Sequence, residues 1–209
     1  MIGDNDQPLV LIVDDDEAMR RSMAFLFSSI GLETNIFASA AELLQALPEP
    51  EHCRPGALVL DVRMPGMSGL ELQRHLRDRD CPLPILIVTG HGDVPMAVEA
   101  LKAGAFDFIE KPFKEQLLLD AVAAAIRLSR ENLLRGARRR SVEERLARLG
   151  RRERDVLDGI LAGKPNKVTA YELDLSIKTI EAYRASVMTK MEAGSLAELA
   201  LMVSSVIDG

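Results

Sequence analysis

The sequence predicts an α/β fold: a doubly wound, five-stranded parallel sheet, joined by a long helical linker to a small all-α domain. Short apolar runs alternate with helical patterns as far as Pro112, and only helical periodicity follows. The charge changes as well. Residues 1–126 carry 10 basic and 20 acidic side chains (net −10), residues 127–150 carry 8 and 3 (+5), and residues 151–209 carry 8 and 9 (−1). This pattern is typical of two domains and a solvated connector.

Apolar runs of four or five residues predict the strands. The clear runs are Leu9–Val13, Ala57–Leu60, Ile85–Val88 and Phe106–Ile109, and a weaker one covers residues 34–37. Helical patterns lie between them. One runs from Glu17 to Ile30 and ends before Gly31, one occupies 39–47 with Ser39 and Glu42 as a capping box, and one runs from Val94 to Ala103. Alternating strands and helices predict a parallel sheet covered on both faces.

Beyond Pro112 the pattern predicts helices only. Residues 114–149 read as one long helix with a possible break at Gly136, and four shorter helices follow at 151–162, 166–173, 177–192 and 196–206. Ser195 and Glu198 form a second capping box. The segment GKPNKVTAYELDLSIKTIEAYRASVMTKM has the layout of a helix-turn-helix, with Ser176 capping its second helix.

Polar residues gather where the predicted strands end. Asp14, Asp15 and Asp16 follow the first strand, and Asp61, Thr89 and Lys111 follow later ones. Ligands of open α/β sheets bind at this edge. Converging carboxylates repel each other, so either their pKa values rise or a cation sits among them, and hard oxygen ligands favour Mg²⁺.

A lysine and a threonine beside carboxylates complete a site for a phosphoryl group. Asp61 could attack phosphorus to give an acyl phosphate, while Mg²⁺ and Lys111 stabilise the phosphoryl oxygens. A simpler interpretation makes the acidic run a solvated loop. It is disfavoured because Asp61, Thr89 and Lys111 each end a different strand.

The strings VDDDEAMR, LDVRMPGMSGLEL and VTGHGDVPMAVEALKAGAFDFIEKPF resemble the receiver domain of bacterial two-component response regulators, a flavodoxin-like fold, over about residues 8–126. The resemblance implies that Asp61 is the phosphoacceptor and that Phe108 turns inward on activation. It implies Mg²⁺ ligands at Asp14, Asp15, Asp61 and the backbone carbonyl of Arg63. It also implies that Thr89 and Lys111 contact the phosphoryl group, and that the Lys111–Pro112 bond is cis.

The C-terminal helices, from about residue 147 to 206, resemble the LuxR-type DNA-binding domain, and the whole chain is similar to response regulators of the FixJ type. The shared strings are HGDVPMAVEA, KPF, RER, NK, TIE-AYRA and VMTKM. The resemblance implies that the 177–192 helix enters the major groove, with bases facing Glu181, Ala182 and Ala185. Phosphates would meet Asn166, Lys167, Thr179, Arg184 and Lys190, and Lys178 would also lie on the DNA side.

Before the resemblance is considered, the same helices also fit an ordinary small bundle, with Ile180, Val187 and Met191 on the packed face. Three residues depart from the family pattern. Gly150 stands where a capping Ser or Thr is usual, Thr169 where an apolar residue is usual, and Tyr171 where a basic or small one is common. Some lost stability is expected from them, with function kept.

These interpretations predict a transcription regulator that is not an enzyme, with a receiver at 1–126, a linker at 127–146 and a DNA-binding domain at 147–209. The expected partners are a sensor histidine kinase, promoter DNA, RNA polymerase and, on phosphorylation, a second copy bound through about residues 94–110. The FixJ type implies oxygen or nitrogen-fixation control. No signal peptide and no run near the roughly 18 apolar residues of a membrane span occurs, so the protein is expected in the cytoplasm.

Two alternative functions remain. A Mg²⁺-dependent phosphohydrolase also uses an aspartate nucleophile, but it would need a general-acid Asp two residues after Asp61, where Arg63 stands. A phosphoryl sink or adaptor whose helices bind only protein is disfavoured by the helix-turn-helix. Cys53 and Cys81 have no metal-ligand spacing and are interpreted as structural thiols.

Overall fold

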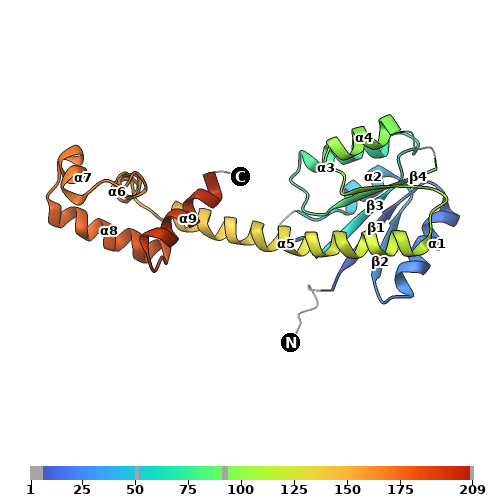
Figure 1. The fold of residues 1–209 in the computed structure, drawn as a ribbon, viewed down its shortest axis with the longest axis horizontal. Helices are drawn as coiled ribbons and strands as arrows, with labels where there is room; N and C mark the ends of the chain where they lie inside the picture. The colour runs from blue at the N-terminus through green and yellow to red at the C-terminus, as the bar shows by residue number, and fades with distance from the viewer. Residues whose placement is uncertain (1–6, 50–51, 91–93, 208–209) are drawn as a thin grey trace. The chain divides into compact units, whose positions relative to one another are not determined.

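The structure is a computed structural model that describes residues 7–49, 52–90 and 94–207 (Figure 1). The chain divides into two compact units, Met1–Leu134 and Arg135–Gly209. Each unit has a hydrophobic core of its own, and each is described by itself.

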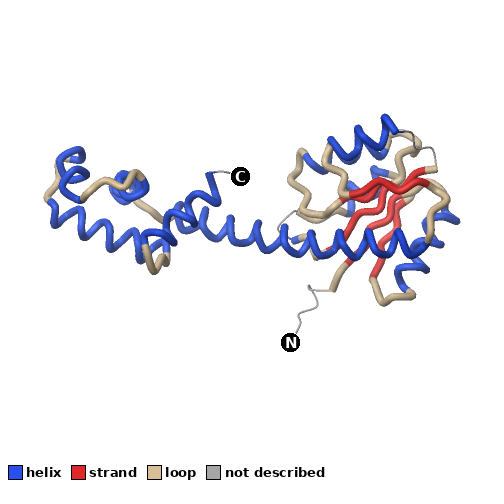
Figure 2. Tube along the Cα trace, in the orientation of Figure 1, coloured by secondary structure: helices blue, strands red, loops and turns tan. Residues whose placement is uncertain are grey.

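The first unit contains a sheet, whose strands are red in Figure 2. The sheet is parallel and has five strands in the order β2-β1-β3-β4-β5. The strands are β1 (Leu9–Val13), β2 (Glu33–Phe37), β3 (Gly56–Leu60), β4 (Ile85–Thr89) and β5 (Asp107–Glu110). Every residue of β3 and β4 is buried, as expected when helices cover both faces. The predicted fold class is confirmed, with strand ends within one residue of the predicted ones.

Helices cover both faces of the sheet (Figure 1). One face packs against α2 (Ala40–Ala46), α3 (Gly69–Arg77) and α4 (Val94–Lys102). The other face packs against α1 (Glu17–Ser28) and the first half of α5 (Glu115–Ala147). The strand order changes direction between β1 and β3, so the carboxyl ends of these two strands border the crevice where this class of sheet binds ligands.

The sequence interpretation named no helix at residues 69–77, where the structure has α3. Its start carries the same capping box that marks residues 39–47: the Ser68 hydroxyl accepts from the Glu71 amide, and the Glu71 carboxylate accepts from the Ser68 amide at 2.8 Å. The signal was present in the sequence.

The possible break at Gly136 is not found, because Gly136 lies inside α5, which is one continuous helix of 33 residues. A glycine inside a helix costs only about 1 kcal/mol relative to alanine, and its arginine and alanine neighbours are good helix formers.

The second unit is helical. It contains α6 (Arg151–Leu161), α7 (Asn166–Leu173), α8 (Ile177–Met191) and α9 (Leu196–Ile207). Its core also includes Val142 of α5 and Leu149 of the turn after α5, so the end of α5 belongs to this unit. Asp174 adopts a left-handed conformation (φ 54°) that ends α7, and the Ser176 hydroxyl caps α8 by accepting from the Thr179 amide at 3.0 Å, as predicted. No helix within the described ranges is long and apolar enough to cross a membrane.

Candidate functional site

A lysine joins two buried carboxylates at the carboxyl edge of the sheet. Asp14 follows β1 and Asp61 follows the neighbouring β3, with exposed fractions of 1% and 6%. The Nζ atom of Lys111 lies 2.6 Å from Oδ2 of Asp14 and 2.9 Å from Oδ1 of Asp61. The structure therefore brings together three of the predicted site residues, although they are up to 97 positions apart in the sequence.

Backbone hydrogen bonds between strand ends hold these residues in place. The amide of Asp61 donates to the carbonyl of Val13 at 2.8 Å, and the amide of Lys111 donates to the carbonyl of Thr89 at 2.8 Å. Thr89 is 1% exposed and ends β4, beside Lys111. The Lys111–Pro112 peptide bond is cis, as the resemblance implied.

Each buried carboxylate also accepts a backbone hydrogen bond. Oδ2 of Asp61 accepts from the amide of Arg63 at 2.7 Å, and Oδ1 of Asp14 accepts from the amide of Asp16 at 2.9 Å. One oxygen of each carboxylate thus faces Lys111 and the other is fixed by the chain. Such bonds to charged groups are stronger than neutral ones, so both side chains are preorganised.

The electrostatics of the cluster favour a protonated Lys111 shared by the two carboxylates. Burial raises the pKa of the Asp61 carboxyl, and the negative charge of Asp14 adds to this, against the opposing hydrogen bond from Lys111. Burial alone would lower the pKa of the Lys111 ammonium. The hydrogen bonds and charges of Asp14 and Asp61 outweigh it and raise that pKa. Lys111 therefore stays protonated, and two carboxylates share its single charge.

The run of three aspartates has three different roles. Asp14 is buried in the cluster, whereas the side chain of Asp15 is exposed. Asp16 accepts hydrogen bonds from the amides of Ala18 and Met19 and caps α1. The residue pattern alone placed all three at the end of the first strand, whereas the resemblance implied Mg²⁺ ligands at Asp14 and Asp15 only. The structure assigns Asp16 to the helix.

Oxygen atoms near Asp61 fit a small hard cation. In the described part of the chain, no three His, Cys, Asp or Glu side chains gather closely enough to hold a metal by themselves. Mg²⁺ usually takes only one or two carboxylates and keeps several waters. Asp14 and Asp61 supply two, Asp15 is exposed on the same loop, and the exposed Arg63 adjoins Asp61 through its backbone.

Two further residues shape this edge. Phe108 on β5 is half-buried and packs against the core on the α2–α4 face. Gly69, the first residue of α3, was not singled out from the sequence. A Cβ atom at position 69 would lie 2.1 Å from the backbone oxygen of Asp61, so only glycine lets α3 begin this close to the site.

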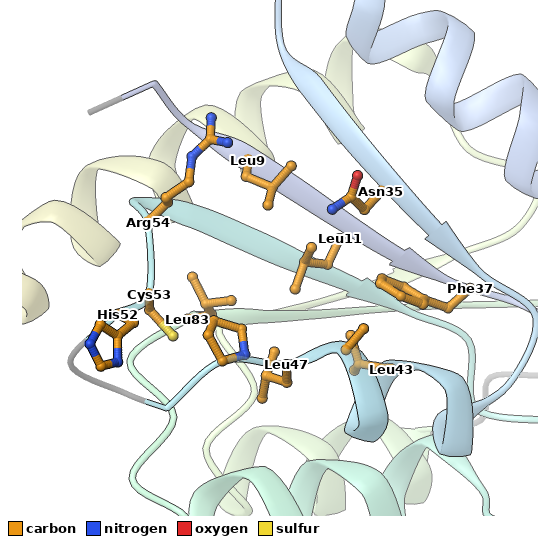
Figure 3. A pocket seen from close by; sticks show the side chains of 12 residues that line it. Leu9, Leu11, Asn35, Phe37, Leu43, Leu47, His52, Cys53, Arg54 and Leu83 are labelled. Atoms are coloured by element: carbon orange, nitrogen blue, oxygen red, sulfur yellow. The ribbon is translucent and has the colours of Figure 1, made fainter. Parts of the chain in front are cut away.

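A separate cavity of about 130 Å³ lies between α2, the first two strands and the segment before β3 (Figure 3). Its lining is mostly apolar, with Leu11, Phe37 and Leu43 on one side and Cys53 near its edge. The Cys53 thiol donates a hydrogen bond to the backbone carbonyl of Glu49 at 3.8 Å, and Cys81 is half-buried. Among the described residues, the cavity lining includes none of the acidic cluster.

In the second unit, α8 presents an exposed face. Its exposed residues are Lys178, Glu181, Ala182, Ala185 and Thr189, and they recur at helical spacing opposite the buried Ile180, Val187 and Met191. Lys167 on α7 is exposed as well, and Asn166 and Thr179 are half-buried. The structure therefore places most of the predicted DNA-contacting residues on accessible surface.

Two of the predicted phosphate contacts are less available, because one is half-buried and the other is paired within the second unit. Arg184 is half-buried on the packed side of α8. Lys190 donates to Oε2 of Glu153 on α6 at 2.7 Å. The Glu153 carboxylate also accepts from the Ser186 hydroxyl at 2.6 Å and from the Gly150 amide at 2.7 Å. The hydrogen bond from Lys190, followed by those from Ser186 and Gly150, lowers the pKa of Glu153 to about 2.

The three departures from the family pattern are accommodated. Gly150 caps α6 without a side chain, and Glu153 supplies the capping bond to its amide. Thr169 is buried, and its hydroxyl donates to the Pro165 carbonyl at 3.5 Å, as expected for a threonine inside a helix. Tyr171 is 89% exposed on α7.

Each of the two units matches a known protein family. Residues 10–123 match the response regulator receiver domain, and residues 147–203 match the bacterial regulatory proteins of the luxR family. Transcriptional regulatory protein FixJ of Bradyrhizobium diazoefficiens is 47% identical over 190 residues, 91% of each chain. Response regulator protein TodT of Pseudomonas putida is 40% identical over 96% of this chain and 87% of that one.

The solved structure of response regulator StyR is similar to this chain along almost its whole length. It has a TM-score of 0.80 and 39% identity, and the match covers 95% of this chain and 98% of StyR. Receiver domains take a phosphoryl group from a histidine kinase, and LuxR-type domains bind DNA. The chain thus belongs to the two-component response regulators, as a FixJ-like, phosphorylation-activated transcription regulator and not an enzyme.

Proposed function

We propose that Asp61 accepts the phosphoryl group from a phosphohistidine of the partner kinase. A carboxylate oxygen of Asp61 attacks phosphorus, the N–P bond breaks, and the histidine nitrogen leaves with the bonding electron pair. The observation that carries this proposal is the contact of the buried Asp61 with Lys111 at 2.9 Å, because the lysine can stabilise charge on the transferred group.

The ligands of Mg²⁺ would be Asp14, Asp15, Asp61 and the backbone carbonyl of Arg63. A bound Mg²⁺ would offset the negative charge of the carboxylates and of the phosphoryl oxygens. Lys111 bonds both Asp14 and Asp61 at present, so it can turn toward the phosphoryl oxygens without leaving the site.

Thr89, Lys111 and Phe108 would convert phosphorylation into a change of surface. The phosphoryl group on Asp61 carries close to two negative charges, about one more than the carboxylate it replaces. Its oxygens attract the Lys111 ammonium and can accept a hydrogen bond from the Thr89 hydroxyl. Thr89 ends β4, and α4 is the next helix along the chain, so a movement of Thr89 would change the position of α4. Phe108, half-buried on β5, then turns inward to fill the space left behind.

The changed surface, about residues 94–110, would bind a second copy of the chain. On α4, Val94, Val98 and Leu101 are 77%, 43% and 48% exposed. Exposed apolar side chains on one short helix support a symmetric contact, in which the same patch serves both protomers. A dimer would present two DNA-binding domains to half-sites about one helical turn apart.

Promoter DNA would receive α8 in its major groove, with Glu181, Ala182 and Ala185 toward the bases. Asn166, Lys167, Lys178, Thr179, Arg184 and Lys190 would border the phosphates. The exposure of Lys167 and Lys178 supports this placement.

We place the receiver at 1–126, the linker at 127–146 and the DNA-binding domain at 147–209. A protein that binds promoters would act in the cytoplasm, with RNA polymerase as a further partner.

Intact mass measurement tests the phosphoryl site. The chain is incubated with acetyl phosphate and Mg²⁺ as wild type, Asp61→Asn and Asp120→Asn, the last removing an exposed carboxylate of α5. One phosphoryl group should be gained by the wild type and by Asp120→Asn, and none by Asp61→Asn. A stable adduct on Asp61→Asn would overturn the assignment.

The likeness to FixJ also leads us to propose control by oxygen or nitrogen-fixation conditions. TodT is nearly as similar to this chain as FixJ is, so the alternative is a signal other than oxygen or nitrogen-fixation conditions. Transcripts of a strain lacking the gene, compared with its parent at low and ambient oxygen, decide between them. Changes confined to low oxygen support the proposal, and changes independent of oxygen contradict it.

A further inference from the structure

The turn between α5 and α6 lies against one side of α8. Glu153 on α6 accepts hydrogen bonds from Ser186 and Lys190, and the Lys190 ammonium also donates to the backbone carbonyl of Arg148 at 3.4 Å. Ser186 and Lys190 follow the exposed Ala182 at four-residue intervals, so they form the row of α8 beside its exposed face. These contacts place residues 148–151 next to that face.

Two arginines of this turn carry positive charge that no acidic side chain in the described part of the chain neutralises. Arg148 and Arg151 are both exposed, and they flank Leu149, which is only 5% exposed and anchors the turn in the core. Throughout the described ranges, neither arginine side chain has an ion-pair or hydrogen-bond partner. Lys190 on the same side is paired with Glu153.

We propose that Arg148 and Arg151 form a second phosphate-contact surface, which binds the DNA backbone that borders the groove occupied by α8. The inference rests on the proposed insertion of α8 into the major groove. Charge complementarity and continuity with the exposed face of α8 favour DNA over a protein partner. Phosphates are the same in every sequence, so this surface adds affinity and leaves base preference unchanged.

Salt dependence of DNA binding tests the proposal. The phosphorylated full-length chain is titrated onto a fluorescein-labelled duplex of random sequence at increasing KCl and constant Mg²⁺. The variants are Arg148→Gln with Arg151→Gln, Arg138→Gln with Arg140→Gln as the matched control, and Lys178→Gln on α8. Arg138 and Arg140 are also exposed, and they lie on α5 of the same unit. The plot of log binding constant against log salt should become less steep by about 0.9 for each phosphate that the variant no longer neutralises.

The expected result is a shallower slope for the 148/151 pair and for Lys178→Gln, with the 138/140 control close to wild type. The Arg148→Lys with Arg151→Lys variant should restore the wild-type slope, because lysine keeps the charge. An equal decrease in slope for the two arginine pairs would mean that only the overall charge matters, and would overturn the proposal. A decrease confined to Lys178→Gln would overturn it while leaving the α8 interface intact.

If wild type binds without salt dependence, the proposed DNA interface fails as well. Folding of each variant is checked by tyrosine fluorescence, since the chain has two tyrosines, Tyr171 and Tyr183, and no tryptophan. Both lie in the second unit.

Discussion

The carboxylate of Glu153 on α6 accepts a hydrogen bond from the ammonium of Lys190 on α8, with 2.7 Å between Oε2 and Nζ. Through the same side chain, α8 is joined to the first residues of α6, because Glu153 also bonds the Gly150 amide and the Ser186 hydroxyl. The buried Glu153 therefore fixes the helix that we propose for base recognition against its neighbour.

Replacing Glu153 by glutamine should destabilise the second unit by about 1 kcal/mol near neutral pH, which is the typical net contribution of one hydrogen bond to stability. The pKa of Glu153 is lowered to about 2 in the folded protein, from 4.5. A lowered pKa means that the carboxylate stabilises the fold above about pH 4.5 and that this stabilisation is lost as the pH falls toward 2. The difference between wild type and Glu153→Gln should shrink over that interval.

Urea unfolding followed by tyrosine fluorescence measures this, because both tyrosines lie in the second unit. Asp155→Asn is the control, since Asp155 on the same helix pairs with Arg152 only at 3.7 Å. It should change the free energy of unfolding by less than about 0.5 kcal/mol. A Glu153→Gln difference that stays constant from pH 7 to pH 3 would contradict the pairing.

Replacing Lys111 by glutamine should separate metal binding from signalling. The ammonium lies within 2.9 Å of both Asp14 and Asp61, so its positive charge opposes a second cation there. Its removal should tighten Mg²⁺ binding, roughly tenfold for about 1.4 kcal/mol of repulsion removed, as measured by titration calorimetry. Phosphorylation should then no longer raise DNA affinity, because the cation that pairs with the phosphoryl group is gone.

Lys114→Gln is the matched control, because Lys114 is an exposed lysine that follows the same strand. Its Mg²⁺ affinity and its response to phosphorylation should both equal those of wild type. Weaker Mg²⁺ binding in Lys111→Gln would show that the lysine holds the carboxylates in place more than it repels the metal.

The sequence was sufficient to predict the sheet and the acidic cluster, since apolar runs fix the strands and polar residues at their ends must meet in a parallel sheet. The residue pattern alone could not separate Asp14 from Asp16, because an aspartate that caps a helix and one that lines a site look the same in a run of three; only the family resemblance set Asp16 apart. Helical periodicity also could not predict the hydrogen bonds of Glu153, because Ser186 and Lys190 lie 33 and 37 positions away in the sequence.

Gly69 and Gly136 should respond in opposite ways to alanine. A Cβ at position 69 meets backbone atoms of Asp61, which cannot yield, so Gly69→Ala should destabilise the first unit by about 1–3 kcal/mol and slow phosphorylation. At position 136, inside α5, the nearest atom is the flexible end of Arg140 at 3.4 Å. Gly136→Ala should therefore stabilise the helix by about 0.5–1 kcal/mol. Thermal unfolding by circular dichroism, with tyrosine fluorescence for the second unit, measures both, and equal melting curves for the two variants would contradict this reasoning.

A charge on α4 should prevent phosphorylation-dependent dimerisation. Leu101 is 48% exposed, so Leu101→Asp should leave the fold and the phosphoryl transfer intact. In a symmetric contact the new carboxylate would be buried on both protomers, close to its own copy, and burial of an unpaired charge is strongly unfavourable. Phe25→Asp is the control, because Phe25 is 77% exposed on α1, which packs on the opposite face of the sheet from α4. Sedimentation with acetyl phosphate should show dimers of wild type and Phe25→Asp and only monomers of Leu101→Asp; if Phe25→Asp alone stays monomeric, the contact lies on the α1 face and the proposed surface is wrong.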